Sequence, residues 1–557
     1  MNAPQAVPSI WTTGSTEAIK TGTWRAALPH HIHAPSPCHQ ACPVNGDIAE
    51  WIGLARARDF RAAWDVLVRH NPFPSVAGRI CHHPCETACN RTSFDESLAI
   101  CKLERSIGDM ALAQGWRYTP PAAERSQHVA VVGAGPSGLS AAYHLRRRGY
   151  RVTVFESQPE PGGLMRYGIP PYRLARAVLD GEIERITALG VELRCGQALA
   201  TAADFEQLRR THDAIYLAVG ARRAKRLPQL PDAAPWLMDG AEYLARANAG
   251  AAPALGTRLV VVGGGSAAMD VARSARRAGH EVTILALESA AQMPAQREEL
   301  AEALEEGIKL VDGAMLTAVT PPATTGQALV LSCERVRFEP GTQRGRFTLQ
   351  AVPGSLFTMQ ADAIVTAIGQ DPDLAPWGST LPVEGGLLAV DDRQATRSDA
   401  VWAGGDATSL ARFVTEAIGM GQRAAQEIDR AFGGGVDAAG AAAFTADAAV
   451  VGLGPIATWY YPPQARPADV HRPIAERLAS GAEVQLGFEL EQALAETGRC
   501  FSCGTCTHCD NCFHYCPDLA IIRTDGGYAV LSDYCKGCGI CVKECPTGSM
   551  TMREELR

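Results

Sequence analysis

Apolar and polar positions along the chain follow two different patterns. Short apolar runs of strand type occur at 128–132 (HVAVV), 151–155 (RVTVF), 258–262 (RLVVV) and 281–285 (EVTIL). The first and third runs each lead into a glycine-rich turn and then an apolar pattern of helical period. Such strand–turn–helix–strand units predict doubly wound α/β domains. Between 48 and 68, apolar residues at helical spacing instead predict an N-terminal helical domain.

The first unit carries the sequence GAGPSG after its apolar run. Gly133 suits the tight turn, Gly135 lets the backbone approach a pyrophosphate, and Gly138 lets the helix pack on the strand. An acid, Glu156, ends the next strand and can bind ribose hydroxyls. This full context predicts a dinucleotide site. Its predicted contacts are Gly133, Gly135, Pro136, Ser137, Gly138 and Glu156.

The second unit begins at RLVVVGGGSAAMD. Gly263 and Gly265 hold the first two glycine positions, and Ala268 replaces the third glycine. Two units in one chain predict two dinucleotides, with the second unit inserted into the first domain. The predicted contacts of the second turn are Gly263, Gly265, Ser266, Ala267 and Ala268.

Ten cysteines lie between Cys500 and Cys545, and eight of them form two runs of C-x2-C-x2-C-x3-C-P. This is the spacing of bacterial ferredoxins, in which the fourth cysteine of each run ligates the other [4Fe-4S] cluster. Zinc knuckles are the alternative, but zinc sites use isolated CxxC pairs. The predicted ligand sets are Cys506, Cys509, Cys512 and Cys545 for one cluster, and Cys516, Cys535, Cys538 and Cys541 for the other.

A second cysteine group lies near the N-terminus. The segments CHQACP and CHHPCETAC bring together cysteines at helical spacing. We predict one [4Fe-4S] cluster here, with zinc as the alternative. Neighbouring histidines are expected to be packed or exposed side chains and not ligands. The predicted ligands are Cys42, Cys81, Cys85 and Cys89.

Composition narrows the range of possible functions. The chain has 557 residues, 46% hydrophobic, with a net charge of -8, so a nucleic-acid surface is not expected. No apolar run reaches the length of a membrane span, and the N-terminus lacks a signal pattern. Eighteen cysteines, mostly at metal spacings, favour a reducing cytoplasm. Cys195 and Cys333 are the only cysteines between positions 102 and 499, so we expect no redox disulfide beside the dinucleotide sites.

These motifs resemble the small-subunit family of glutamate synthases, which shares its N-terminal iron–sulfur domain with dihydropyrimidine dehydrogenase. The resemblance implies a multidomain α/β fold: a helical iron–sulfur domain, Rossmann-like FAD and NAD domains, and an α+β ferredoxin domain. It assigns FAD to the first unit. It also implies flavin contacts in GGLMRYGIPPYRL (162–174) and in the GGDAT segment, at Gly163, Leu164, Arg166, Ile169, Gly405 and Asp406.

The family resemblance also indicates which nicotinamide cofactor the second unit binds. Members that use NADPH carry arginines after the second strand of this unit, where this chain has Leu287, Glu288 and Ala290. Glu288 would repel a 2′-phosphate by roughly 3 kcal/mol per unit charge at ~5 Å and an effective dielectric constant of ~20. Its spacing is also that of an acid that binds the ribose of NAD. We therefore predict NAD(H), with a phosphate-binding arginine elsewhere as the alternative.

The family normally carries an R-C-x2-C-G segment before the position of Cys38, and this chain lacks it there. RCFSCG at 499–504 resembles the missing piece. One hypothesis is that it folds back to complete a fourth cluster, and the alternative is a structural pair. The hypothetical ligands are Cys38, Glu104, Cys500 and Cys503.

Together these features predict an NAD(H)-dependent flavoprotein oxidoreductase with three or four [4Fe-4S] clusters. A flavin accepts a hydride and releases single electrons, so it can link nicotinamide to clusters. We expect an electron-transfer subunit whose partner resembles a 2-oxoacid:acceptor oxidoreductase. The alternatives are a self-contained NADH:ferredoxin reductase, a glutamate synthase small subunit and a redox-regulatory protein. The predicted segments are 1–120 (iron–sulfur), 125–250 and 361–432 (FAD), 251–360 (NAD), 433–499 (Gly/Ala-rich linker and connector) and 500–557 (ferredoxin).

Overall fold

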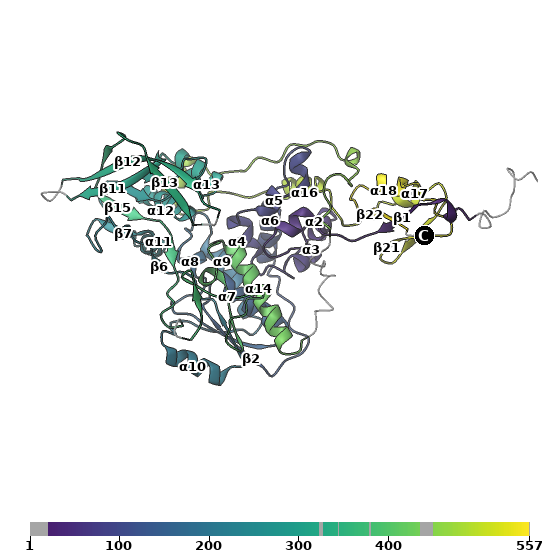
Figure 1. Cartoon of the computed structure of the whole chain (residues 1–557), viewed down its shortest axis with the longest axis horizontal. Coiled ribbons are helices and arrows are strands. Elements are labelled where there is room, and N and C mark those ends of the chain that lie inside the picture. Colours follow the sequence, from purple (N-terminus) through teal and green to yellow (C-terminus); the bar gives the residue numbers. More distant parts are fainter. Residues whose placement is uncertain (1–19, 322–326, 343–344, 378–379, 435–448, 556–557) are drawn as a thin grey trace, which may run out of the picture.

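The computed structural model of the chain describes residues 20–321, 327–342, 345–377, 380–434 and 449–555. Figure 1 shows a helical body at the centre, one α/β body below it, a second α/β body at the left, and a small body that carries the C-terminus at the right. The predicted multidomain α/β fold class, with a helical N-terminal part and a small C-terminal body, is confirmed.

The central body consists of short helices around buried aromatic and aliphatic side chains. Trp51, Ile52, Trp64 and Phe73 are almost fully buried in its core. Proline stands at the first position of three of these helices, where its missing N–H costs no hydrogen bond. The helices are α1 (Pro37–Ala41), α2 (Ile48–Arg56), α3 (Phe60–Leu67), α4 (Pro74–Ile80), α5 (Pro84–Thr87) and α6 (Ile100–Ala113), with the 3₁₀ turn η3 (Asn90–Ser93).

The first α/β body is built on a parallel five-stranded sheet in the order β19-β5-β2-β3-β4. Its central strands are buried on both faces, as parallel sheets covered by helices require. The strands are β2 (His128–Val132), β3 (Arg151–Phe155), β4 (Glu192–Arg194), β5 (Ala214–Leu217) and β19 (Val401–Ala403). The helices are α7 (Pro136–Arg147), α8 (Leu164–Tyr167), α9 (Arg176–Thr187), α10 (Ala202–Thr211) and α14 (Val414–Ala431), with the turn η4 (Gly405–Ala407).

The second α/β body repeats this plan with the strand order β10-β9-β8-β15-β7. An antiparallel sheet of β11, β12, β13 and β14 packs beside it. The strands are β7 (Leu237–Asp239), β8 (Arg258–Val262), β9 (Glu281–Leu285), β10 (Lys309–Val311), β11 (Ala314–Thr320), β12 (Leu329–Pro340), β13 (Phe347–Ala351), β14 (Phe357–Ala361) and β15 (Ala363–Thr366). The helices are α11 (Gly240–Asn248), α12 (Ser266–Arg277) and α13 (Arg297–Glu305).

The second sheet extends beyond the predicted segment 251–360. Strands β7 and β15 belong to it, although 361 onward was expected to return to the FAD domain. Ile364 and Val365 are fully buried because β15 lies between β8 and β7. The small ladder of β6 (Arg223–Ala224) with β16 (Gln370–Asp371) lies at the crossover instead. Chain order alone did not reveal that a strand outside the insertion completes its sheet.

The C-terminal body contains α17 (Asn511–His514), β20 (Ile521–Thr524), β21 (Gly527–Val530), α18 (Ile540–Lys543) and β22 (Met550–Glu554). A strand from the other end of the chain completes it. β1 (Ala27–His31) pairs antiparallel with β22, and Gly22 in the turn η2 (Gly22–Trp24) donates to Asp533 C=O at 2.9 Å. The predicted segment 1–120 is therefore divided between two bodies.

The connector packs along the molecule as an ordered strap where it is described, while residues 435–448 of the predicted linker lie outside the described residues. It contains η5 (Thr458–Tyr460), α15 (Ile474–Ala479) and α16 (Leu490–Gly498). Glu483 accepts hydrogen bonds from Arg79 (2.6 Å) and Arg105 (2.9 Å) of the central body. Arg477 pairs with Glu305 of the second α/β body at 2.8 Å. The strap therefore joins the nicotinamide domain to the central body.

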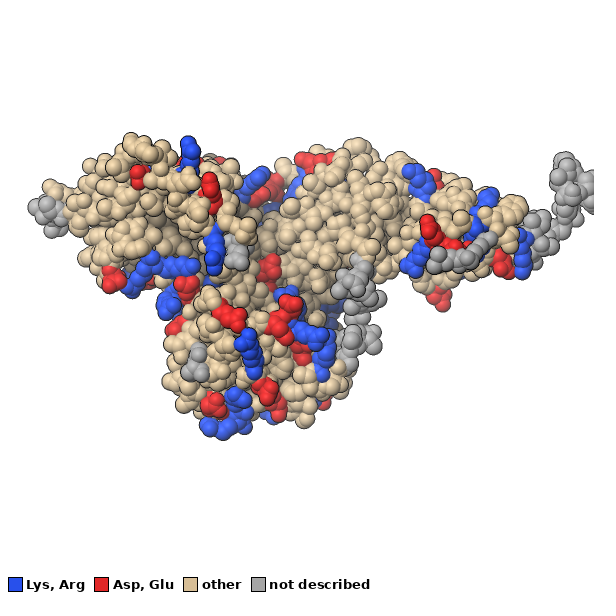
Figure 2. Space-filling view, viewed as in Figure 1, with Lys and Arg blue, Asp and Glu red and all other residues tan. Residues whose placement is uncertain are grey.

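Charged side chains are interspersed in both signs on the face in Figure 2, without a continuous basic area. Among the described residues, no helix has both the length and the apolar character needed to span a membrane.

A buried ion-pair network holds α16 against the central body. The carboxylate of Glu496, fully buried, binds Arg499 at 2.8 Å and accepts from the Ala99 backbone N–H at 2.7 Å. Arg499 also lies 3.3 Å from Asp95, which pairs with Arg91. A buried charge of this kind is costly if its partner is removed.

We expect Glu496→Ala to destabilise the protein by about 3–5 kcal/mol, because it leaves Arg499 buried without its main partner. The matched control is Glu50→Ala, which removes a half-exposed pair with Arg69 at 3.2 Å and should cost no more than about 1 kcal/mol. Denaturant unfolding followed by tryptophan fluorescence measures both. Equal midpoints for the two variants would contradict the network's role.

Candidate functional site

The first glycine-rich turn has the geometry predicted from its sequence. Gly133 has φ +106°, and a Cβ there would lie 2.3 Å from the Ala218 carbonyl oxygen. A Cβ on Gly138 would lie 1.9 Å from the Gly133 carbonyl oxygen. Helix α7 begins directly at Pro136, with Ser137 in its first turn. The turn therefore presents the N-terminal backbone N–H groups of α7 to an anion, as a pyrophosphate requires.

Glu156 lies at the carboxyl end of β3, beside this turn. Its buried carboxylate accepts hydrogen bonds from the backbone N–H groups of Ala134 and Gln158, both at 2.8 Å. These bonds fix the carboxylate at the edge where a dinucleotide ribose would lie.

The remaining FAD candidates approach the same turn. A Cβ on Gly163 would lie 2.8 Å from the Gly135 Cα, and a Cβ on Gly405 would lie 3.1 Å from the Ser137 Cβ. Burial raises the pKa of the neighbouring Asp406. These glycines leave a cradle at the start of α7 that larger residues would fill, so the residues present fit an extended dinucleotide.

The side chains of the 162–174 loop mainly hold the loop in place. Arg166 donates to the Pro161 carbonyl at 2.6 Å and pairs with Asp180. The Ile169 carbonyl accepts from Arg176 at 2.8 Å, and Leu164, which begins α8, is 38% exposed. Of the four predicted contacts in this loop, Gly163 approaches the turn through its backbone, whereas Arg166 is occupied within its own loop.

The second turn repeats the first with one substitution. Gly263 has φ +143°, and a Cβ there would meet the Ala367 carbonyl oxygen at 2.4 Å. At Gly265 a Cβ would meet nothing within 4 Å. Ser266 and Ala267 begin α12, and Ala268 is fully buried against the strand. This turn therefore accepts alanine where the first turn needs Gly138.

Glu288 lies against this second turn. A Cβ on Gly264 would lie 2.5 Å from its Oε2 atom, and burial raises the pKa of Glu288. A second acid is close by, because the Asp312 carboxylate accepts from the Ala290 N–H at 2.9 Å. Arg335 donates to the Asp312 carbonyl at 2.6 Å. Glu288 thus stands at the second turn, with Asp312 and Arg335 both close to the segment that follows it.

One group of predicted metal ligands lies against the flavin domain. Burial raises the pKa of Cys42 to about 12, with Glu104 and Cys81 as further neighbours that raise it. Burial likewise raises the pKa of Cys85 well above its usual value, and Cys42 and Cys81 are its neighbours. Burial raises the pKa of Glu104 to about 8, and its carboxylate accepts from Asn71 at 2.8 Å. Three thiols and a carboxylate therefore gather here.

A second group lines one hollow between the central body and the segment after α16. Ile48, Ile52 and Phe501 are among the apolar walls of this hollow. Asn90 donates to the Cys503 sulfur at 3.3 Å. Burial raises the pKa of Cys500 to about 11 and that of Cys503 to about 12. The four thiols in the hollow are Cys38, Cys89, Cys500 and Cys503.

The structure thus divides the N-terminal ligands differently from the sequence prediction. Cys89 does not lie with Cys42, Cys81 and Cys85 but in the hollow with Cys38, and Glu104 takes its place. The physical reason is local: Cys89 caps η3, and the chain turns there away from α5 toward Arg499. The predicted C-x3-C-x3-C set assumed one continuous helix, but α5 ends at Thr87.

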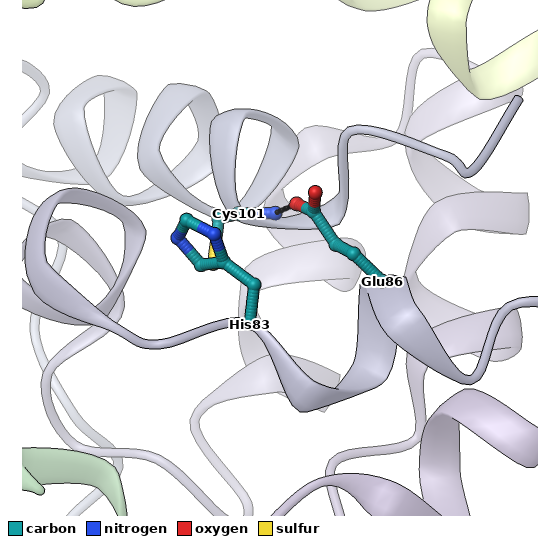
Figure 3. Close-up of side chains that lie close together, drawn as sticks. All are labelled: His83, Glu86 and Cys101. Carbon is teal, nitrogen blue, oxygen red and sulfur yellow. Dashed lines mark hydrogen bonds between the residues drawn. The ribbon is translucent and has the colours of Figure 1, made fainter. Parts of the chain in front are cut away.

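Cys101, which belongs to no predicted ligand set, lies beside the first group. A hydrogen bond from the Cys101 thiol lowers the pKa of Cys81. Figure 3 shows Cys101 with His83 and Glu86, whose ligand atoms lie within 4.8 Å of one another. The Glu86 carboxylate already has two partners. It accepts a hydrogen bond from the Cys101 backbone N–H at 2.9 Å and forms an ion pair with Arg466 at 2.7 Å. This trio is therefore better explained as packing around Cys81 than as a cation site.

The ferredoxin cysteines gather as the spacing predicts. Cys506, Cys509, Cys512 and Cys545 line one hollow. Burial raises the pKa of Cys541 to about 12. The neighbouring thiols of Cys535, Cys516 and Cys538 raise this pKa further. The fourth cysteine of each run therefore lies with the other run. Four thiols in a partly buried hollow are the donor set that a [4Fe-4S] cluster requires.

Two residues that the sequence did not identify stand next to these groups. Tyr461 Oη lies 3.2 Å from the carbonyl oxygens of both Phe501 and Pro546, so it bridges the hollow of Cys500 and the residue after Cys545. Thr415, at the start of α14, lies 3.5 Å from the Cys81 sulfur. Neither residue belongs to a motif, so only the fold could reveal its position.

Comparison with known proteins supports the assignment of the domains. Residues 127–423, more than half of the chain, match the pyridine nucleotide-disulphide oxidoreductase family. Residues 32–116 match the family described as dihydropyrimidine dehydrogenase domain II, 4Fe-4S cluster, and residues 528–551 match a 4Fe-4S binding domain. The predicted oxidoreductase with flavin, nicotinamide and 4Fe-4S domains is confirmed at this level.

Three relatives extend the likeness. The chain is 34% identical to the NADP(+)-dependent formate dehydrogenase subunit beta of Moorella thermoacetica, over 86% of this chain and 72% of the relative. It is 33% identical to the glutamate synthase [NADPH] small chain of Azospirillum brasilense, over 70% and 85%. It is 31% identical to the NAD-dependent dihydropyrimidine dehydrogenase subunit PreT of Salmonella typhimurium, over 71% and 90%. The resemblance to glutamate synthase small subunits is thereby confirmed, and the chain belongs to the pyridine nucleotide-disulphide oxidoreductase family.

Proposed function

We propose that this chain is the NAD(H)-linked electron-transfer subunit of a larger oxidoreductase, with FAD and four [4Fe-4S] clusters. The observation that carries the proposal is the hollow shared by Cys38, Cys89, Cys500 and Cys503. It joins the C-terminal ferredoxin body to the central body through a common set of thiols. Without it, the ferredoxin sites would be separated from the flavin domain.

The proposed ligand sets follow the grouping in the structure. The set nearest the flavin domain replaces the predicted one, and the carboxylate of Glu104 supplies its fourth ligand. Burial disfavours free thiolates at these positions, and cluster iron would supply the positive charge that they need. The four sets are Cys42, Cys81, Cys85 and Glu104; Cys38, Cys89, Cys500 and Cys503; Cys506, Cys509, Cys512 and Cys545; and Cys516, Cys535, Cys538 and Cys541.

Contacts between the sets define an order. The first set abuts α14 of the flavin domain, where Thr415 lies 3.5 Å from the Cys81 sulfur and His82 stacks on Phe413 with centroids 3.9 Å apart. One turn of α1 separates Cys42 of the first set from Cys38 of the second. Tyr461 then links the second set to the segment of Cys545 in the third. The fourth set lies beyond it, at the far end of the chain's ferredoxin body.

This order suits an electron relay. FAD, when bound, would accept a hydride from the nicotinamide and pass electrons on singly. The chain's own residues would hold FAD at the turn of Gly133, hold the nicotinamide dinucleotide at the turn of Gly263, and place each cluster site beside the next. Strap contacts such as Arg477 with Glu305 keep the nicotinamide domain attached to the same frame.

The preference for NAD(H) rests on Glu288 and its surroundings. Its carboxylate lies against the Gly264 turn, where the adenosine ribose would be bound, and Asp312 adds a second acid nearby. A 2′-phosphate would have to be placed beside these charges. Names of relatives include both NADP(+) and NAD, so they favour neither cofactor. We infer that the negative charge of Glu288 favours binding of NAD(H) over NADP(H).

The proposed partner is a catalytic subunit that exchanges electrons with the ferredoxin body. A 2-oxoacid:acceptor oxidoreductase remains the prediction from the sequence. A formate-oxidising partner is the second candidate, because the likeness to the Moorella subunit covers 86% of this chain.

The ligand regrouping predicts a specific pattern of iron loss. Cys89→Ala and Cys500→Ala should each remove about four of about sixteen irons, and the double variant should lose no more than either single one. Cys42→Ala combined with Cys89→Ala should lose about eight. Iron analysis and EPR of the reduced protein measure these losses, with FAD content as the check on folding.

Cys195→Ala is the matched control, since Cys195 lies outside every set, and it should keep all the iron. If the Cys89→Ala, Cys500→Ala double variant loses about eight irons, the two cysteines serve different clusters and the proposed set is wrong.

Glu288 should control the nicotinamide preference. We expect the unmodified protein to reduce a dye faster with NADH, and Glu288→Ala to lower the NADH:NADPH ratio of kcat/KM on the order of a hundredfold, because one unit-charge repulsion is removed. Glu281→Ala, at the exposed start of β9, is the control and should leave the ratio unchanged. A preference of the unmodified protein for NADPH would sink the assignment. Arg335→Gln would then test whether that arginine binds the phosphate.

Native purification tests the place of the chain in a complex. We expect the chain to co-purify with a catalytic subunit, identified by mass spectrometry, and the substrate of that subunit to reduce the clusters. Isolation as a monomer with full ferredoxin reductase activity would favour the self-contained reductase instead. Negligible NADH-dependent dye reduction by the fully loaded protein would favour a regulatory role.

A further inference from the structure

One histidine from the N-terminal strand enters the ferredoxin body. His31 ends β1, which pairs with β22 so that His31 stands opposite Met550. Its side chain lines the hollow formed by Cys506, Cys509, Cys512 and Cys545. The residue is therefore more than 470 positions away in the chain from the nearest of these cysteines, yet it forms a wall of their site.

The imidazole ring is held in a fixed position. Gly527 has φ +134°, and a Cβ there would lie 2.2 Å from the His31 Cε1 atom, so only glycine leaves room for the ring. Tyr528 packs edge-on against it, with centroids 5.7 Å apart. The Tyr528 hydroxyl is itself fixed by donating to Asp510 at 2.9 Å. These contacts make the ring a built part of the hollow.

One ring nitrogen has no protein partner. The Nε2 atom of His31 is buried and makes no hydrogen bond to any residue that the structure describes. A buried polar atom left unpaired is costly, so such atoms normally have a partner. The hollow is lined by four thiols, and the sulfurs of a cluster bound there would be negatively charged acceptors.

We propose that His31 donates a hydrogen bond from Nε2 to a sulfur of the cluster held by Cys506, Cys509, Cys512 and Cys545, and that this bond raises the cluster's reduction potential. The inference rests on the proposed cluster in that hollow. The reduced cluster carries more negative charge than the oxidised one, so a donor stabilises the reduced form more. Hydrogen bonds to the sulfurs are among the features that set cluster potentials. His31 is thus a positioning residue that acts through the cluster.

The role assigns a function to the N-terminal strand itself. His31 reaches the hollow because β1 pairs with β22. This pairing would therefore set the reduction potential of the third cluster as well as attach the N-terminal segment to the ferredoxin body. The same arm reaches the fourth site through Arg25, which lies 3.4 Å from the Cys535 carbonyl oxygen. Among the described residues of this arm, His31 is the one that places an unpaired side-chain nitrogen in a ligand hollow.

The test compares His31→Phe, His31→Gln and His30→Phe in the full, cluster-loaded protein. Phenylalanine removes the donor, glutamine supplies another N–H, and His30 is the matched control, because alternate residues of a strand point to opposite faces. EPR-monitored redox titration should show that His31→Phe lowers the reduced:oxidised ratio of one cluster at a fixed potential on the order of tenfold. His31→Gln should restore part of it, and His30→Phe should change nothing.

A second measurement takes its main result from the unmodified protein. With ¹⁵N-histidine incorporated, pulsed EPR of the reduced protein should show a weak nitrogen coupling to one cluster, which disappears in His31→Phe. Absence of that coupling in the unmodified protein, or an unchanged potential in His31→Phe, would overturn the proposal. Iron analysis distinguishes failure of the proposed cluster from failure of the proposed role of His31. If the unmodified protein lacks the irons of this site, the proposed cluster is wrong. If the irons are present but the coupling is absent, only the role of His31 is wrong.

Discussion

The arrangement of this molecule depends on how the segment after α16 is anchored in the central body. A buried network of Glu496, Arg499, Asp95 and Arg91 fixes that segment, and Arg91 also donates to the Arg499 carbonyl at 2.6 Å. Because this network is desolvated, its members hold one another in a single geometry. It places Cys500 and Cys503 in the hollow of Cys38. The proposed route from flavin to ferredoxin requires this placement.

The two dinucleotide turns show how similar motifs meet different constraints. In the first, the Gly133 carbonyl lies so close to Gly138 that no side chain fits. In the second, Ala268 is accommodated and buried. The acids that follow also differ: Glu156 accepts two backbone hydrogen bonds at 2.8 Å, whereas Glu288 lies against the Gly264 backbone. The first site is thus more tightly specified, as a permanently bound cofactor needs, than a site that a nicotinamide enters and leaves.

The sequence predicted features that depend on local spacing, and these include both glycine turns, Glu156 and the crossed ferredoxin cysteine sets. The prediction from the sequence was wrong where the chain changes direction between neighbouring elements. Cys89 was grouped with Cys85 because a helix was assumed to continue, and Glu104 was assigned to the other site. The strand at 363–366 was assigned to the flavin domain because it follows the predicted insertion, yet it pairs with β8 inside that insertion and with β7 before it. Tyr461 and His31 had no local signal, since Tyr461 contacts residues 40 and 85 positions away and His31 lines a hollow whose cysteines lie more than 470 positions away.

The pairing of distant segments has a consequence for biosynthesis. Asn90 and Cys503, which meet at the second cysteine hollow, are 413 residues apart in the chain. A ribosome that has completed the central body has therefore not yet made half of the thiols that this hollow needs, and β1 must wait still longer for β22. Contacts this distant form late and expose unfinished surfaces in the meantime. A chain that stops before Cys500 therefore holds only Cys38 and Cys89 of the four thiols and leaves this hollow incomplete.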